Sequence, residues 1–201
     1  MNPHATLPVE LLTLLPPPLQ AAVEPVALER GKTLFAQGTR PVALFYVVRG
    51  EVVLERAGRQ GQAVVLQRVR RGFVAEASMQ SSRYHCSGLA TVAGQVFRLP
   101  MTPLKAALQD DCRFAVRWIG MLNDEVRRLR AQTERLTLKG VEARLLHLIE
   151  TEGRAGRLAI ESGLKSLSAQ LGVTHEALYR TVAALEQQGR LARRDGVLLL
   201  R

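Results

Sequence analysis

Four side chains that can recognise a nucleic-acid base lie close together near the C-terminus: His175, Glu176, Tyr179 and Arg180. Arginine can bind O6 and N7 of guanine through two hydrogen bonds, and a carboxylate can accept one from cytosine N4. Residues four apart share one face of a helix, so Glu176 and Arg180 are expected to act side by side. An ion pair between them is the plainer interpretation, although it would stabilise the helix by only ~0.3–0.5 kcal/mol. The two interpretations are compatible, and the chemistry expected here is base recognition.

Two helices joined by a tight turn are expected to position these side chains within residues 164–191. Gly172 supplies the backbone freedom that ends the first helix, and the Thr174 hydroxyl can cap the second. A helix-turn-helix holds its second helix away from the domain, so that polar side chains at its start reach the major groove. A helical hairpin in an enzyme core is the alternative, but it explains these polar residues less well. Apolar residues recur at intervals of three and four along both helices, at Leu164, Leu167, Leu171, Leu178, Val182 and Leu185.

A short β-hairpin is expected after the second helix. Residues 191–200 contain Asp195-Gly196, a dipeptide typical of two-residue hairpin turns. Arg193 and Arg194 precede the turn, where they can contact phosphates next to the reading helix. A basic hairpin in this place is typical of the wing of a winged helix. The side chains predicted to contact DNA are Thr174, His175, Glu176, Tyr179, Arg180, Arg193 and Arg194.

The composition of the chain indicates a partner that carries negative charge. Its 201 residues have a formal net charge of +10 at pH 7, which favours a polyanion such as double-stranded DNA. The excess is divided equally, with +5 in residues 1–100 and +5 in residues 101–201. Net charge alone therefore does not locate the binding face.

The expected location of the protein is cytoplasmic. Cys86 and Cys112 lack CxxC spacing, as expected for reduced thiols. No apolar run approaches the roughly 18 residues of a membrane span, and the N-terminus lacks the pattern of a signal peptide. No contact with a membrane is expected.

The N-terminal half of the chain has the sequence pattern of a small antiparallel β domain. Short helices are expected over residues 8–15 and 18–23, on either side of a triple proline. Glycines, among them Gly50, Gly72 and Gly94, are expected to mark turns between the strands that follow. This pattern predicts a β-roll of jelly-roll or cupin-like type over residues 1–101, and the whole chain is expected to be α+β. The predicted strands cover residues 33–35, 43–48, 51–55, 63–67 and 88–99.

A long helix is predicted over residues 102–138, between the roll and a C-terminal domain of residues 139–201. Its apolar stripe follows three heptads, with β-branched residues at the first position and leucine at the fourth. This preference is typical of parallel two-stranded coiled coils, so the helix is expected to form a homodimer. The alternative is a single helix lying on its own barrel. The stripe consists of Ile119, Leu122, Val126, Leu129, Thr133 and Leu136.

Two segments, in this order and with a heptad helix between them, resemble the Crp/Fnr family of bacterial transcription regulators. GKTLFAQGTRPVALFYVVRGEVVL, residues 31–54, is similar to the start of the family's cyclic-nucleotide-binding-type β-roll. LGVTHEALYRTVAALEQQGRL, residues 171–191, resembles its recognition element. The resemblance implies a homodimer that binds a two-fold DNA site, works with RNA polymerase and responds to a signal in the roll. The base-contacting glutamate and arginine of the family fall on Glu176 and Arg180.

The resemblance weakens at the effector pocket. Nucleotide-binding members carry a Gly-Glu-Leu segment, of which only Glu76 is kept here, with Ala75 in place of the glycine. The arginine-serine pair that holds the cyclic phosphate falls on Tyr84-His85, or on Arg83-Tyr84 if the gap is placed differently. Control by cyclic AMP is therefore not expected, although a cyclic-nucleotide-responsive regulator stays an alternative. The candidate pocket residues are Glu76, Arg83, Tyr84, His85 and Thr133.

His85 and Cys86 have the chemistry of haem or metal ligands. Adjacent residues in a strand point to opposite faces, so this pair cannot enclose an ion alone, and no cofactor or metal site is expected. A haem- or metal-sensing regulator and an effector-independent one are the alternatives. A cupin-like enzyme would need a metal triad or an acid/base pair, whereas the roll segment contains only His4 and His85. Enzymatic activity is not expected.

Overall fold

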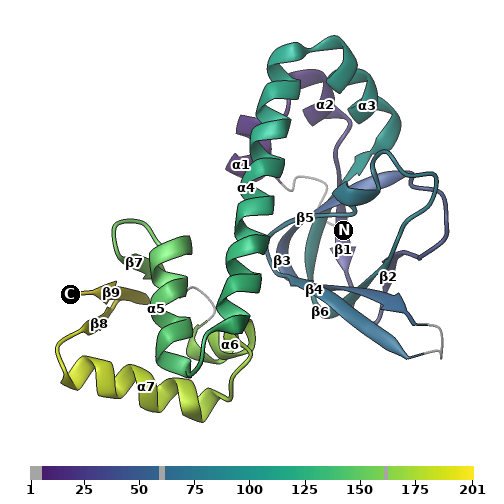
Figure 1. Ribbon diagram of the computed structural model, residues 1–201. Coiled ribbons are helices and arrows are strands. Elements are labelled where there is room, and N and C mark those ends of the chain that lie inside the picture. The colour runs from purple at the N-terminus through teal and green to yellow at the C-terminus, as the bar shows by residue number, and fades with distance from the viewer. Residues whose placement is uncertain (1–5, 59–61, 161–162) are drawn as a thin grey trace. The chain divides into compact units, whose positions relative to one another are not determined.

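The computed structural model describes residues 6–58, 62–160 and 163–201 (Figure 1). His4 lies outside the described residues. The chain divides into two compact units, Met1–Ile119 and Gly120–Arg201. The boundary between them falls inside the segment of residues 102–138 that the sequence predicted to be a long helix.

The first unit is an antiparallel β-roll with short helices before, between and after its strands. The strand order is β1-β6-β3-β4, with β2 beside β6 and β5 beside β3. The strands are β1 (Glu24–Leu28), β2 (Thr33–Phe35), β3 (Ala43–Ala57), β4 (Ala63–Val69), β5 (Gly72–Val74) and β6 (Ser87–Pro100). The helices are α1 (Val9–Leu14), α2 (Pro17–Ala21), the 3-10 helix η1 (Glu76–Ser78) and α3 (Met101–Asp110).

Strands β3 and β6 run side by side and form the frame of the roll (Figure 1). The predicted turns at Gly50 and Gly94 were wrong, because both strands continue through these positions with shifts of register. Gly50 has a φ of +96°, and a Cβ at Gly94 would lie 2.0 Å from the carbonyl oxygen of Arg49. Glycine is required here because the two backbones approach each other closely. The first half of β3 then pairs with β5 and its second half with β4, which curls the sheet.

The helix predicted over residues 102–138 is two helices, α3 and α4 (Cys112–Thr137). Asp111 leaves the helical conformation, with φ −119° and ψ 95°. Its carboxylate oxygen Oδ1 accepts a hydrogen bond from the Phe114 amide at 2.9 Å and so caps the start of α4. An aspartate in an otherwise helical stretch was the available signal for this break.

The first turns of α4 pack on the roll. Phe114 and Trp118 are buried, and the Trp118 ring meets the Phe73 ring edge-on, with 5.2 Å between centroids. Residues one turn apart share a helix face, so these aromatic rings anchor one side of α4 and leave the side of Ile119 open. The interpretation of a helix on its own barrel therefore holds for the start of α4.

The second unit is a winged helix. Its core gathers apolar side chains of the three helices that follow α4, together with Leu191 and Leu198 of the sheet. The sheet has the order β7-β9-β8, of which β7 was not predicted. After the end of α4 the elements are α5 (Val141–Glu152), β7 (Arg157–Ala159), α6 (Gly163–Leu171), α7 (His175–Gln187), β8 (Leu191–Arg194) and β9 (Val197–Leu200).

The architecture confirms the predicted α+β class, with an antiparallel roll, a long helix and a C-terminal winged helix. Within the described ranges, no helix combines the length and the apolar character needed to cross a membrane.

Candidate nucleic-acid interface and effector residues

Helices α6 and α7 form the helix-turn-helix that the sequence predicted. Gly172 occupies the turn with a φ of +66°, a conformation that other residues rarely adopt. The Thr174 hydroxyl oxygen accepts a hydrogen bond from the Ala177 amide at 3.2 Å and caps α7. Leu178, Val182 and Leu185 are buried in the core of the unit. This buried stripe fixes which side chains at the start of α7 face outward.

The outward face of α7 begins with three charged or polar side chains. His175, Glu176 and Arg180 are all exposed to solvent. Among the residues that the structure describes, neither Glu176 nor Arg180 has an oppositely charged partner within 4 Å, so the ion pair that was the plainer interpretation is not formed. Both side chains keep their hydrogen-bonding capacity available for a ligand.

Tyr179 connects α7 to the wing. Tyr179 is 51% exposed, and its ring lies 6.0 Å from the His175 ring, centroid to centroid. The Arg193 guanidinium of β8 lies over the Tyr179 ring, 5.8 Å from its centroid, a geometry typical of a cation–π contact. The contact joins residues that lie far apart in sequence, and no sequence pattern indicates it. It holds Arg193 beside α7.

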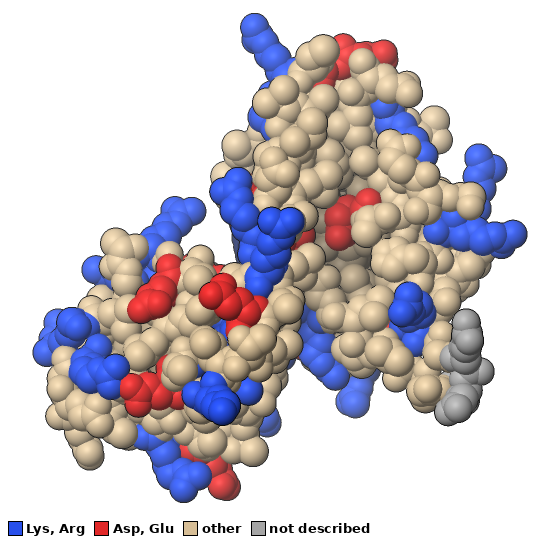
Figure 2. All heavy atoms as spheres, in the orientation of Figure 1, with Lys and Arg blue, Asp and Glu red and all other residues tan. Residues whose placement is uncertain are grey.

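The wing is a two-residue hairpin. Asp195 and Gly196 have φ values of +49° and +73°, and Arg194 pairs with Val197 across the turn. Positive φ at both central residues is the property that favours the Asp-Gly dipeptide. Arg194 is exposed at the end of β8. Figure 2 shows Lys and Arg side chains spread over the visible face of both units, in keeping with the even division of charge along the sequence.

The heptad stripe of α4 faces solvent in the single chain. Ile119 is 56% and Leu136 is 59% exposed, and Val126 and Leu129 are exposed as well, whereas Leu122 is half-buried. The Thr133 hydroxyl donates a hydrogen bond to the Leu129 carbonyl of its own helix at 3.0 Å. A row of exposed apolar residues of this kind is typical of an interaction surface.

The effector candidates of the roll lie in and after η1. Ala75 precedes η1 with a φ of +74° and a ψ of 4°, a conformation that suits the glycine of the related cassettes. Glu76 is half-buried at the start of η1. His85 Nδ1 lies 2.9 Å from the Oγ of Ser78, which is fully buried. The imidazole therefore takes part in fixing η1.

Tyr84 and Arg83 are engaged with the backbone of the loop before β3. The buried Tyr84 hydroxyl donates to the Ala43 carbonyl at 2.7 Å and accepts from the Val42 and Ala43 amides at 3.2 Å. The exposed Arg83 guanidinium donates to the Gly38 carbonyl at 2.7 Å. The Tyr84 hydroxyl is therefore not available to a ligand, and Arg83 would have to leave its carbonyl partner to bind one.

Cys86 is almost completely buried. Burial raises the pKa of its thiol above the ordinary value, and the Glu76 carboxylate nearby raises it further. A soft metal or haem iron binds the thiolate rather than the thiol, so this environment does not favour Cys86 as a ligand. In the described part of the chain, no three His, Cys, Asp or Glu side chains gather into a group that could hold a metal ion.

Glu51 is a buried charged residue that no sequence pattern distinguished. Its carboxylate accepts hydrogen bonds from Thr91 at 2.7 Å, Arg70 at 2.8 Å and Arg68 at 3.2 Å. Burial raises the pKa of Glu51, but the hydrogen bonds from Thr91 and Arg70 and the charges of both arginines outweigh it and lower the pKa. The network ties β4 and β6 to β3, which is a structural role.

Comparison with known proteins gives a domain-family match for one segment and a similar fold over most of the chain. The family model of the cyclic nucleotide-binding domain matches residues 25–111. No curated protein matches the chain in sequence.

Among solved structures, the catabolite activator protein of Thermus thermophilus is 23% identical, with a TM-score of 0.50 over 98% of this chain and 92% of that one. DNR from Pseudomonas aeruginosa is 23% identical, with a TM-score of 0.55 over 96% of this chain and 90% of its own. CLP of Xanthomonas campestris, a c-di-GMP-responsive global regulator, is 19% identical, with a TM-score of 0.51 over 90% and 94% of the two chains. Residues 25–111 are therefore similar to the cyclic nucleotide-binding domain family, and the chain has the fold of these solved regulators.

Proposed function

We propose that this chain is a transcription regulator that binds specific DNA sequences through α7 and the β8–β9 wing. The exposed start of α7 carries the proposal, because Glu176 and Arg180 face solvent without an ion-pair partner in the described part of the chain. Charged side chains on the first turns of such a helix suit base edges in the major groove. A helix hairpin of an enzyme core would bury or pair them.

The regulator acts as a homodimer through α4, in this proposal. Its exposed apolar stripe would be covered by the same stripe of a second chain, as in a two-stranded coiled coil. Because a two-fold protein pair reads a two-fold DNA site, the target is an inverted repeat with half-sites about one helical turn apart. Leu129 lies near the middle of the stripe and is the position most sensitive to a charge.

Selection of DNA from a random pool, combined with sedimentation, tests both parts. We expect enrichment of an inverted repeat and a particle of two chains of 22.2 kDa each. Leu129→Asp should shift the particle to the monomer, because it places an unpaired charge in the seam, and should weaken binding to the full repeat. Enrichment of no sequence would overturn the DNA proposal, and a monomeric wild type would overturn the dimer.

The signal of the roll is proposed to be something other than cyclic AMP. Support comes from Tyr84, whose hydroxyl is held by the backbone. In either placement of the gap, Tyr84 replaces one member of the arginine-serine pair that holds the cyclic phosphate in nucleotide-binding relatives. The family match of residues 25–111 favours the second candidate, a cyclic-nucleotide-responsive regulator. Titration calorimetry with cyclic AMP and cyclic GMP separates the two. Saturable heat at tens of micromolar nucleotide, lost in Arg83→Ala, would establish the second candidate.

The proposal also includes a cytoplasmic location and contact with RNA polymerase, because the chain has the Crp/Fnr-type fold. Haem sensing through His85 or Cys86 is the weaker alternative, since the His85 ring meets the Ser78 hydroxyl and the Cys86 thiol is buried. Absorbance in the visible range after incubation with haem is a direct measurement of that alternative.

A further inference from the structure

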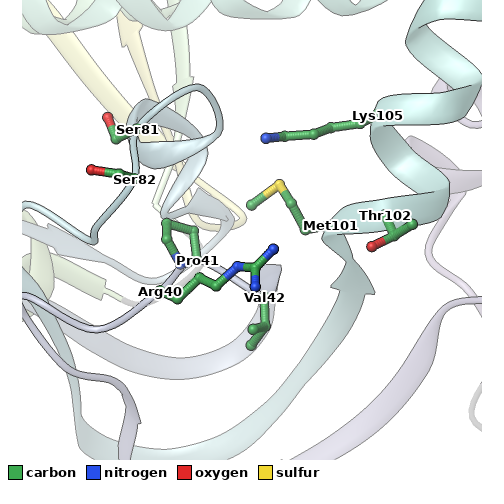
Figure 3. Close-up of a pocket in the computed structure, with 8 residues that line it drawn as sticks. All are labelled: Arg40, Pro41, Val42, Ser81, Ser82, Met101, Thr102 and Lys105. Carbon is green, nitrogen blue, oxygen red and sulfur yellow. The ribbon is translucent and has the colours of Figure 1, made fainter.

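The first unit carries a hollow that the DNA-binding proposal does not use. It has a volume of about 440 Å³ and is formed by the loop before β3, the segment after η1 and the start of α3 (Figure 3). This volume is within the range of small-molecule sites. The residues that line it are Arg40, Pro41, Val42, Ser81, Ser82, Met101, Thr102 and Lys105.

The hollow has an excess of positive charge. Arg40 and Lys105 come from opposite walls, and Figure 3 shows the Lys105 side chain extending from α3 toward the segment that carries Ser81. Neither cation forms a salt bridge or a side-chain hydrogen bond within the described ranges, and the lining includes no carboxylate. Two cations without a counter-charge on one hollow favour an anion between them.

The walls of the hollow are fixed by backbone hydrogen bonds. The Met101 amide donates to the Val42 carbonyl at 2.9 Å and joins α3 to the start of β3. The Tyr84 amide donates to the Thr39 carbonyl at 2.8 Å and joins the segment after η1 to the loop that carries Arg40. A site that is formed before its ligand arrives loses less entropy on binding.

The chemistry of the lining selects the ligand further. A guanidinium can bind two oxygens of a phosphate at once, and an ammonium adds a second charge. Thr102 lies in the first turn of α3, where the helix dipole also favours an anion. The buried Met101 and the neighbouring Val42 offer an apolar wall. We propose that this hollow binds a small phosphate monoester with a compact apolar body, at a site separate from the cassette residues Glu76 and His85.

Titration calorimetry with phenyl phosphate at constant ionic strength tests the proposal on the full chain. One site per chain is expected, with phenyl phosphate bound at least tenfold more tightly than either inorganic phosphate or benzoate, and with no saturable heat from phenol. Inorganic phosphate lacks the apolar body, benzoate carries one charge instead of two, and phenol carries none. Equal affinity for benzoate and phenyl phosphate would overturn the assignment to phosphate monoesters.

Variants of the two cations show whether the ligand is bound in this hollow. Arg40→Ala and Lys105→Ala should each lower the affinity for phenyl phosphate at least fivefold, and thermal melting should confirm that both variants fold. Lys32→Ala removes an exposed cation that does not line the hollow, and should leave the affinity unchanged. Equal losses in all three variants, or no saturation by phenyl phosphate at millimolar concentration, would overturn the proposal.

A DNA-binding measurement on the same variants separates this site from the proposed regulator function. Arg40→Ala and Lys105→Ala should bind the selected DNA as the wild type does. If they lose affinity for DNA and not for phenyl phosphate, the anion recognised by these cations is the DNA backbone, and the small-ligand proposal fails while DNA binding stands.

Discussion

The helix-turn-helix and the segment after β5 both carry candidate binding residues, but the polar side chains of the two regions differ in exposure and in hydrogen bonding. In α7, Glu176 and Arg180 are exposed and have no ion-pair partner in the part of the chain that is described. In the roll, the Tyr84 hydroxyl makes three hydrogen bonds to backbone atoms, and the His85 ring meets the buried Ser78 hydroxyl. One region keeps its polar groups available, and the other uses them to hold its own fold.

This contrast separates two kinds of effect. A polar group that is satisfied within the fold contributes to stability, because its loss leaves its partner without a hydrogen bond. An exposed group contributes little to stability and is available to a ligand. Substitutions in α7 should therefore change DNA binding without changing stability, and substitutions around Tyr84 should do the reverse.

The largest effect is expected at Arg180. Arg180→Ala should weaken binding to the selected DNA site by roughly 1–3 kcal/mol and relax the preference at one base position, with an unchanged melting temperature. Arg180→Lys is the matched control, since it keeps the charge and loses the two-pronged guanidinium. It should retain most affinity for random DNA and lose the base preference. Equal losses on specific and random DNA in Arg180→Ala would show that Arg180 contacts phosphate instead.

Tyr84→Phe tests the other side of the comparison. It keeps the ring, whose centroid lies 4.6 Å from that of Phe35, but removes the hydroxyl. Pro100, the register partner of Ala43, has no N–H to donate in its place. Chemical denaturation should therefore show a loss of about 1–2 kcal/mol in the free energy of unfolding, with DNA affinity unchanged. Tyr179→Phe, which removes an exposed hydroxyl, should leave the stability as it is. Equal stability of the two variants would contradict the role of Tyr84.

The fold could be predicted where local signals agree with the tertiary structure. Gly172, the Thr174 cap and the spacing of the leucines define α6 and α7, and Asp195-Gly196 defines the wing turn, because turns and caps depend on neighbouring residues. Gly50 shows the limit of local signals. A glycine can mark a turn or a close approach of two strands, and only the pairing of β3 with β6 decides between them.

Part of the candidate site could also be predicted from local signals. The outward face of α7 follows from its helical periodicity, so Glu176 and Arg180 were identifiable. The position of Arg193 over Tyr179 depends on how the wing packs against α7. The hydroxyl of Tyr84 has its partners some 40 residues earlier in the chain. The cations Arg40 and Lys105 line one hollow, although neither segment carries a motif that indicates it.

A smaller effect is expected at Arg193. This residue is partly engaged within the fold, through the Tyr179 ring, and partly exposed to solvent. Arg193→Ala should weaken binding to all DNA sequences alike, by about 0.5–1 kcal/mol, and reduce the dependence of log affinity on log salt by about one unit. Arg194→Ala serves as the comparison, since Arg194 is exposed in the same strand without the ring contact. A change in base preference in Arg193→Ala would place Arg193 among the reading residues.

The smallest effect is expected at Ala75, where opposing contributions nearly cancel. Its left-handed backbone, with a φ of +74°, costs an alanine roughly 1–2 kcal/mol relative to glycine. Ala75→Gly removes that strain, but the more flexible unfolded chain costs about 0.5–1 kcal/mol, and the loss of a buried methyl group costs about 0.8 kcal/mol. The free energy of unfolding, measured by denaturation, should therefore change by less than about 1 kcal/mol. A larger stabilisation would mean that the strain at Ala75 dominates, and that this segment, unlike the surroundings of Tyr84, is held against its own backbone preference.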